Sequence, residues 1–313
     1  MNGGARPPAW AFRVGPAVAV LVSTLLFGSG AGAQALVPAE GDGSLSVAYQ
    51  NISVHDHTDY LGVRSPIGTT RSQVLFLRLD YGLTDKLAVS FGLPYIKSKY
   101  TGDSPHVHGK FPGHEAEPVI DDGHYNGGWQ DYGLGLRYQL WTEPWLVTPF
   151  VSSGYPSRDY PFRGHSAIGV RLWRVEFGVN VARQFEPPLD DFYVQSRYGY
   201  SIAEKTLGIG IRASILDLEL GYFLTPRLSA RLFAVWLKTH NGLNLPVDLP
   251  PPPDPRAFEH DRLLKTESVN LGGGLSFRLN DDYTLFGIWL TTVESKNAHA
   301  IHNAFTVGVN RGF

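Results

Sequence analysis

Residues 131–140 read DYGLGLRYQL, and their side chains alternate between two kinds. The even positions carry Tyr or Leu, whereas the odd positions carry Asp, Gly, Arg or Gln. Successive side chains of a β-strand point to opposite faces of the sheet, so this pattern predicts a strand. One face of that strand is apolar and aromatic, and the other is small or charged.

The same two-residue period recurs along the chain, at residues 71–81, 174–181, 216–224 and 269–278. The polar face of these segments is rich in Gly, Ser and Asn with isolated charges, which indicates a confined interior rather than a face open to water. Strands with an apolar outer face and a polar inner face are typical of transmembrane β-barrels. Because lipid cannot satisfy an open backbone edge, the sheet must close. We therefore predict an all-β, antiparallel, up-and-down transmembrane barrel.

The composition of the chain excludes several other classes of protein. Of its 313 residues, 43% are hydrophobic and only 18% are charged, which argues against intrinsic disorder. The absence of cysteine excludes disulfides and thiolate metal sites. A formal net charge of -2 provides no basic surface for nucleic acid, so no nucleic-acid partner is expected.

Residues 1–35 have the three zones of a secretory signal peptide. Arg6 and Arg13 form a positive leader, residues 14–27 are apolar, and small residues follow. Cleavage is predicted after Ala33 or Ala35, which leaves residues 36–313 as the outer-membrane barrel domain. An uncleaved anchor helix is the alternative, although the apolar run is shorter than the roughly 20 residues that span a bilayer.

The connections between predicted strands fall into two classes of length. Short turns are expected at residues 82–86, 141–145, 172–174, 225–227 and 280–282, and long polar connections lie between them. Short periplasmic turns and long outer loops are typical of bacterial barrels. The spacing predicts about twelve strands, at residues 44–55, 71–81, 87–99, 128–140, 146–154, 164–172, 174–185, 213–224, 228–239, 266–279, 283–295 and 299–313.

Residues 186–212 admit two interpretations. Residues 192–202 resemble a strand, but one additional strand would make the count odd, so we interpret the segment as an outer loop. A fourteen-stranded barrel stays open as an alternative. Residues 246–255 contain six prolines and must form an extended loop, since proline cannot contribute to a strand ladder.

Charged side chains on the polar faces are expected to line the lumen, most of them near the short turns. They are five arginines and four carboxylates, which nearly cancel: Arg78, Asp80, Arg137, Arg171, Glu176, Asp217, Glu219, Arg231 and Arg278. Two interpretations are open. The charges could set the selectivity of a pore, or they could form ion pairs that brace a narrow barrel.

The C-terminus resembles the signal that the barrel-assembly machinery recognises. Phe305, Val307, Val309 and Phe313 alternate, and the chain ends on an aromatic residue, although Arg311 stands where a second aromatic residue is common. The assembly machinery, outer-membrane lipid and lipopolysaccharide are therefore the expected partners.

The remaining candidate residues do not predict a chemical site. Histidines cluster in the outer loops, at His55, His57, His106, His108, His114 and His124. A histidine pair two residues apart, or Asp121 and Asp122 with His124, could share a metal ion. Loops collect histidines in any case, so no metal or cofactor is predicted. Ser166 beside His165 and Ser268 beside Glu267 are adjacent only in sequence, so no enzyme is predicted. Two aromatic belts are expected, with Tyr81, Trp141, Trp145 and Trp173 at the short turns and Tyr60, Tyr100, Tyr125, Trp129, Tyr155 and Tyr160 at the outer end.

Several segments resemble one known family. Residues 81–87 (YGLTDKL), 91–95 (FGLPY) and 216–228 (LDLELGYFLTPRL) carry the resemblance, with 239–243 (THNGL), 260–264 (HDRLL) and 297–300 (NAHA). They are similar to outer-membrane barrels of the MetA-pathway of phenol degradation family, from about residue 44 to the end. The resemblance implies a barrel in a Gram-negative outer membrane and suggests hydrophobic or aromatic solutes. It implies no catalytic residues.

The sequence thus predicts an outer-membrane barrel that acts as a passive channel for small molecules, whose solute is unknown. No nucleotide-binding motif is present, and diffusion through a lined path requires none. The alternative is a structural or surface-binding barrel with a closed lumen, which acts through its long outer loops.

Overall fold

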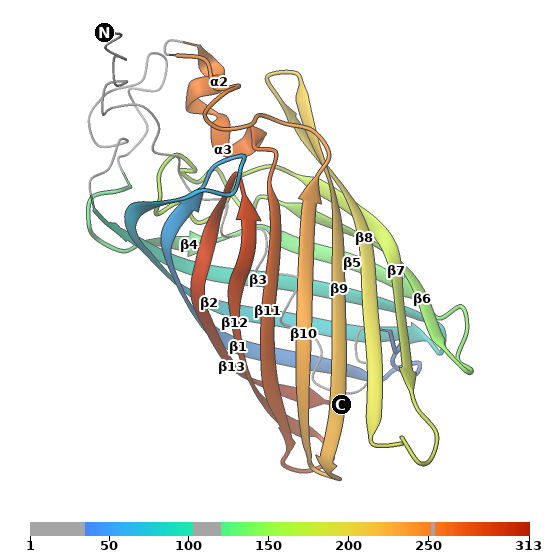
Figure 1. The fold of residues 1–313 in the computed structure, drawn as a ribbon. Coiled ribbons are helices and arrows are strands. Elements are labelled where there is room, and N and C mark those ends of the chain that lie inside the picture. Colours follow the sequence, from blue (N-terminus) through green and yellow to red (C-terminus); the bar gives the residue numbers. More distant parts are fainter. Residues whose placement is uncertain (1–34, 103–119, 252–253) are drawn as a thin grey trace, which may run out of the picture.

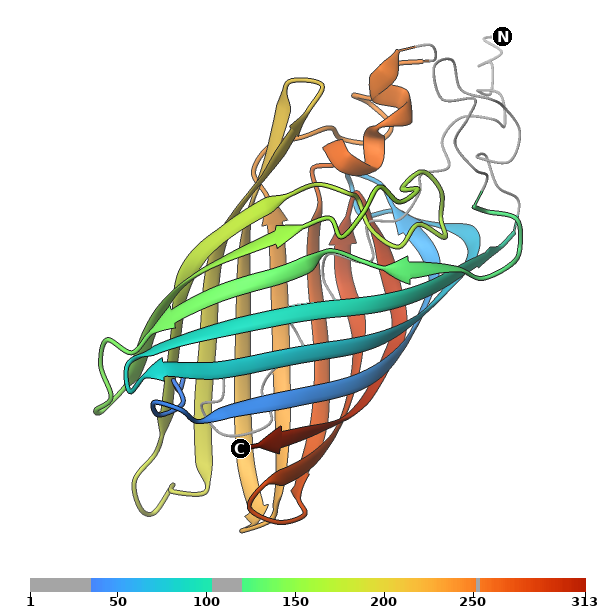
Figure 2. The same ribbon diagram turned by 180° about the vertical axis from the view of Figure 1, so that it is seen from behind.

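The computed structural model describes residues 35–102, 120–251 and 254–313, and they form a closed antiparallel β-barrel (Figures 1 and 2). The predicted signal peptide lies outside the described residues except for Ala35, as do His106, His108 and His114. No helix among the described residues is long and apolar enough to cross a membrane.

The strands follow one another around the ring in chain order. Their bounds are β1 Gly43–Thr58, β2 Arg64–Thr84, β3 Leu87–Thr101, β4 Asn126–Trp129, β5 Tyr132–Tyr138, β6 Leu146–Tyr155, β7 Arg174–Gln184, β8 Phe192–Thr206, β9 Ile209–Thr225, β10 Leu228–Thr239, β11 Glu267–Arg278, β12 Tyr283–Lys296 and β13 Ala298–Gly312. β4 and β5 both pair with β3 and occupy one position, so the described strands make a ring of twelve.

The ring closes where the last strand meets the first. β13 pairs with β1 along nearly its whole length, from Ser44 opposite Gly312 to Thr58 opposite Ala298. At the end of the chain the Gly43 N–H donates to the Phe313 carbonyl (2.8 Å), and the Phe313 N–H donates to the Gly43 carbonyl (3.0 Å). The fold class and the count of about twelve strands are therefore confirmed.

Two predicted segments are assigned wrongly. One predicted strand is absent and one predicted loop contains a strand, so the number of strands is unchanged. Residues 164–172 are not a strand, because the whole connection between β6 and β7 is irregular. Residues 186–212 are not a loop, because they contain β8 and the start of β9, which join in a tight turn at Leu207 and Gly208 with positive φ. The predicted short turn at residues 172–174 thus lies at the outer end of the barrel, and Trp173 lies there too.

The outer end also carries the two helices of the described residues, in the connection between β10 and β11 (Figure 1). They are α2, Pro255–Phe258, and α3, His260–Leu263. The four other predicted short turns join strands at the opposite end, which we assign to the periplasm.

The inner face of the barrel differs from the predicted small and polar face on one side of the ring. On β2, β3 and β12 inward positions in the middle part of the strands are apolar and buried, as at Phe76, Ile96 and Ile288. Tyr100 and Tyr160 are likewise buried in the interior and do not belong to the outer aromatic belt. These apolar positions need a partner inside the barrel.

The position of β8 can be tested with a charge on its lipid-facing side. Tyr198 is 43% exposed on the outer face of β8. We expect Tyr198→Lys to lower the free energy of unfolding by about 2 kcal/mol or more, since a lysine facing the bilayer interior loses its hydration. Asp190→Lys, in the exposed turn before β8, is the control and should change it by less than about 0.5 kcal/mol. Urea unfolding in lipid vesicles measures both, and equal effects would contradict the strand assignment.

Candidate functional site

The connection between β6 and β7, residues 156–173, folds into the outer half of the lumen, and we call it the inner loop. Tyr160 and His165 of this loop are fully buried, and Ile168 is 5% exposed. Tyr160 and Ile168 belong to one apolar cluster with the inward side chains of β1, β2, β3, β12 and β13. The inner loop is therefore the partner of the apolar inner wall.

Polar contacts hold the inner loop against the strands. The His165 ring stacks on Tyr100 of β3 with a centroid distance of 4.4 Å, and Thr70 of β2 donates to the His165 carbonyl (3.3 Å). Tyr160 donates to the Asp131 carboxylate (2.5 Å) in the break between β4 and β5. Burial raises the pKa of Tyr160, and so does the neighbouring Asp131, so the hydroxyl stays protonated as a donor.

The turn at His165 and Ser166 is fixed by the residues before β4. The Asp121 carboxylate accepts from the His165 N–H and the Ser166 N–H, both at 2.8 Å. The Ser166 hydroxyl donates to the Ile120 carbonyl (2.5 Å). Ser166 is fully buried in this turn, where it is a structural donor. Ser268 is also buried, at the outer end of β11.

Glu259, just before α3, and Arg262, within α3, contact the inner loop from the outer side. The Nε of Arg262 donates to the Val170 carbonyl (2.8 Å), and its guanidinium lies 3.3 Å from the ring centroid of the buried Phe162. Glu259 pairs with Arg262 (3.3 Å) and with Arg163 of the inner loop (2.6 Å). Burial lowers the pKa of Arg262, and Glu259 opposes that effect. These contacts clamp the inner loop in place.

Charged side chains occupy the lumen below the inner loop, in two groups. In the first group, Asp80 pairs with Arg78 (2.6 Å) and with Arg137 (3.0 Å). These three side chains are between 9 and 20% exposed. This group has one carboxylate and two arginines.

The second group lies on β7, β8, β9 and β10. Arg197 pairs with Glu176 (2.6 Å) and lies 3.5 Å from Asp217. Arg231 lies 3.6 Å from Glu219, which also accepts from the Tyr193 hydroxyl (2.8 Å). This group has three carboxylates and two arginines.

Arg197 was absent from the predicted lumen residues because β8 was interpreted as a loop. The alternation of Tyr193, Gln195 and Arg197 with outward residues was the signal that could have found it. Two predicted residues lie elsewhere. Arg171 is in the inner loop, where it pairs with Asp159, and Arg278 is exposed at the periplasmic end, where it donates to the Pro226 carbonyl (2.7 Å).

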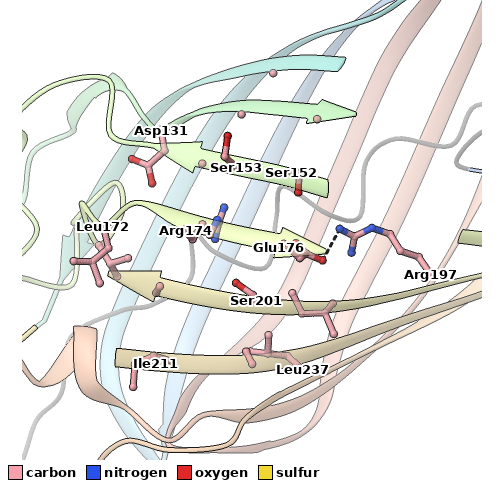
Figure 3. Close-up of a pocket in the computed structure, with 18 of the residues that line it drawn as sticks. Asp131, Ser152, Ser153, Leu172, Arg174, Glu176, Arg197, Ser201, Ile211 and Leu237 are labelled. Atoms are coloured by element: carbon pink, nitrogen blue, oxygen red, sulfur yellow. Dashed lines mark hydrogen bonds and ion pairs between the residues drawn. The ribbon is translucent and has the colours of Figure 1, made fainter. Parts of the chain in front are cut away.

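A cavity of about 320 Å³ lies between the inner loop and the strands (Figure 3). Figure 3 shows the Glu176–Arg197 pair and Leu172 of the inner loop at opposite sides of the view, with Leu237 below the pair. Ala213, Ile215 and Leu237 make a continuous apolar patch in its wall, and hydroxyls of Ser152 and Ser201 interrupt the apolar surface. The cavity can hold a small molecule that is mostly apolar.

The periplasmic end of the lumen holds the first described residues of the chain. Ala35 is fully buried and its carbonyl accepts from the Thr148 hydroxyl, while the Val37 N–H donates to the Gln139 side chain (3.2 Å). A Cβ at Gly82 would lie 2.1 Å from the Ala39 carbonyl, so only glycine allows the segment to pack there. The lumen is therefore filled from both ends.

Two further sets of candidate residues are the acids and histidines of the outer loops and the residues of the C-terminus. No group of three or more His, Asp or Glu side chains among the described residues could hold a metal ion. Asp122 and His124 lie 3.7 Å apart at the surface, but Asp121 is turned to the inner loop. The C-terminal residues Phe305, Val307 and Phe313 are more than half exposed on the outer face, in or beyond β13.

Comparison with solved structures identifies the fold. The barrel is similar to an outer-membrane channel from Pseudomonas putida F1, with a TM-score of 0.66, 14% identity, and coverage of 89% of this chain and 97% of that chain. The β domain of the Bordetella autotransporter BrkA is 12% identical over 88% of this chain and 100% of its own, with a TM-score of 0.49. The fold is that of outer-membrane β-barrels, which places this chain in the bacterial outer membrane.

No protein-family model and no curated protein matches the chain. The resemblance to the MetA-pathway of phenol degradation family therefore stays a prediction.

The role of the second charged group can be tested by removing its central cation. Arg197→Gln leaves Glu176 and Asp217 without their ion-pair partner in a mostly buried position, and we expect it to lower the free energy of unfolding by about 3 kcal/mol. Arg227→Gln, in the exposed periplasmic turn, should have almost no effect. Urea unfolding in lipid vesicles compares the two variants. If both unfold like the wild type, the pairs do not brace the barrel.

Proposed function

We propose that this protein is a passive outer-membrane channel for small, mostly apolar compounds, and that the inner loop closes its outer entrance. The observation that carries the proposal is the cavity below the inner loop, lined by the apolar patch of Ala213, Ile215 and Leu237 with hydroxyls around it. Such a surface suits a solute with an apolar body and few polar groups.

Two similarities support the proposal. The Pseudomonas putida F1 structure is described as an outer-membrane channel, and it is similar over most of both chains. The resemblance to the MetA-pathway of phenol degradation family suggests hydrophobic or aromatic solutes. Transport of this kind follows the concentration gradient and needs only a lined path.

The charged groups have a second role in this proposal. Arg137 in the cavity wall and Arg231 outside it each place positive charge beside a carboxylate, so an ion that crosses the lumen meets charges of both signs. The two groups together hold four arginines and four carboxylates, so replacing either arginine leaves one negative charge in excess. In planar-bilayer recordings, Arg137→Ala and Arg231→Ala should shift the ion selectivity of any open state towards cations.

Opening requires the inner loop to move, and its clamp can be weakened at Arg262. Arg262→Ala removes the contacts to Val170 and Phe162, and we expect it to raise the open fraction in planar bilayers about tenfold, which corresponds to about 1.4 kcal/mol. Arg256→Ala is the matched control, because this neighbouring arginine is exposed and pairs only with Asp254 among the described residues.

The recordings distinguish the proposal from its alternative. Steady current steps that become more frequent in Arg262→Ala support a gated channel. If the wild type and Arg262→Ala are both silent while heat-dependent gel migration shows them folded, the lumen is closed. The protein would then be a structural or surface-binding barrel that acts through its outer loops.

The solute class can be tested by blocking the ion current. Benzyl alcohol in the cavity should interrupt the current, whereas glycerol should not, because only the first has an apolar body. Leu237→Ser, in the apolar patch, should weaken the block about tenfold, since it removes a buried apolar contact. Leu232→Ser, on the lipid-facing side of the same strand, should leave the block unchanged. Equal block by both solutes would contradict the apolar class.

A further inference from the structure

On the outer surface of β1, β2, β3 and β4, a row of paired apolar and aromatic residues is followed towards the outer end by basic residues. Tyr49 lies opposite Leu75, Leu75 opposite Tyr95, and Tyr95 opposite Trp129. Tyr49, Leu75 and Trp129 are each about 40% exposed, and the rings of Tyr95 and Trp129 make an edge contact with centroids 5.2 Å apart. This row is an apolar and aromatic band of the kind that meets the edge of the bilayer.

The next outward-facing residues towards the outer end are basic. Lys97 follows Tyr95 by two residues, and Lys99 follows Lys97. Arg71 of β2 lies directly opposite Lys99 in the sheet, and Gln73 lies opposite Lys97. We call Arg71, Lys97 and Lys99 the basic triad.

The alternation of the strands shows that the basic triad faces away from the lumen. Ser72, Val74, Ile96 and Ser98 are all at most 7% exposed and point inward, so the residues between them point outward. Lys99 lies over the ring of Tyr125, with its Nζ 5.3 Å from the centroid. A step of two residues is about 7 Å along a strand, so the triad begins immediately beyond the aromatic row.

No carboxylate of the described residues pairs with the basic triad. The outward neighbours in the same rows are Asn51, Ser53 and Gly127, which carry no charge. Lys238, at the outer end of β10, differs because it lies 3.5 Å from Glu267. Arg71 opposite Lys99 places two like charges side by side, which destabilises a sheet unless an anion lies between them.

We propose that the basic triad binds the phosphate groups of a phosphorylated glycolipid of the outer leaflet, lipopolysaccharide. The acyl chains of this lipid would lie along the row of Tyr49, Leu75, Tyr95 and Trp129, and its phosphates would reach the three cations above that row. The charge, the outward direction and the position beside the aromatic row fit an anion fixed at the outer surface of the membrane. This inference does not depend on whether the barrel conducts solutes.

The test is the binding of fluorescent lipopolysaccharide to the refolded full-length mature protein in zwitterionic detergent. Each cation near an anionic lipid surface contributes about fivefold to affinity, so replacing all three residues should weaken binding on the order of 100-fold. The test variant is Arg71→Gln with Lys97→Gln and Lys99→Gln. Lipopolysaccharide dephosphorylated by alkaline phosphatase should bind the wild type as weakly as intact lipopolysaccharide binds the variant.

The control removes three other exposed cations from the outer end. Lys205→Gln, Arg212→Gln and Lys265→Gln together change the net charge equally and should leave the affinity within about twofold. If the control weakens binding as much as the test variant, or if dephosphorylation has no effect, the proposal is overturned. Displacement by millimolar inorganic phosphate would also overturn it in favour of a free-phosphate site.

Heat-dependent gel migration shows whether each variant folds. If the triple variant does not fold, Lys97→Gln alone provides the test, with an expected loss of about fivefold. An unchanged affinity in a folded Lys97→Gln variant would then count against the proposal.

Discussion

Lipid offers no hydrogen-bond partner to a polypeptide backbone, and the rest of this structure follows from that constraint. Each strand must pair on both sides, so β13 returns to β1 and the chain end pairs with Gly43. Backbone hydrogen bonding continues even at the break between β4 and β5. Pro94 has no N–H, but its carbonyl accepts from the Gln130 N–H (2.9 Å) between β4 and β5. The next residue, Asp131, receives the Tyr160 hydroxyl, so the break is also where the inner loop attaches.

A ring of this size encloses more space than its own inward side chains fill. The inner loop enters from the outer end and covers the apolar inner wall, while residues 35–42 enter from the periplasmic end. Between them the wall carries charge, and the charged side chains occur in pairs because an unpaired buried charge is costly. The cavity is the space that these two insertions leave. A channel function therefore requires the inner loop to move away from the barrel wall.

Much of the wall was predictable from the sequence, because its signal is local. Leu134, Leu136 and Phe305 are apolar because they face lipid. The two-residue period of such side chains is visible in the sequence without any knowledge of the fold. Asp80, Arg137 and Glu219 were found as inward residues in the same way. Arg197 was missed because residues 192–202 and residues 164–172 both resemble strands. The requirement for an even number of strands led us to keep residues 164–172 as the strand, which was the wrong choice.

The lumen contents could not be predicted by the same reasoning. Ile168 and Leu172 alternate with polar residues as strand residues do, yet they are buried by contacts inside the barrel. Those contacts come from distant parts of the chain: Asp121 binds the turn at His165 from 44 residues away, and Arg262 reaches Val170 across 92 residues. A pattern that repeats every two residues carries no information about contacts between residues so far apart in the chain.

The sequence by itself determined the barrel, because contact with lipid acts on every second residue of each strand separately. Only the tertiary structure decided which segment closes the lumen, which charges meet, and that Arg71, Lys97 and Lys99 form one outward cluster. These features depend on strand register and on loop paths, and both are set when the ring closes and distant residues become neighbours.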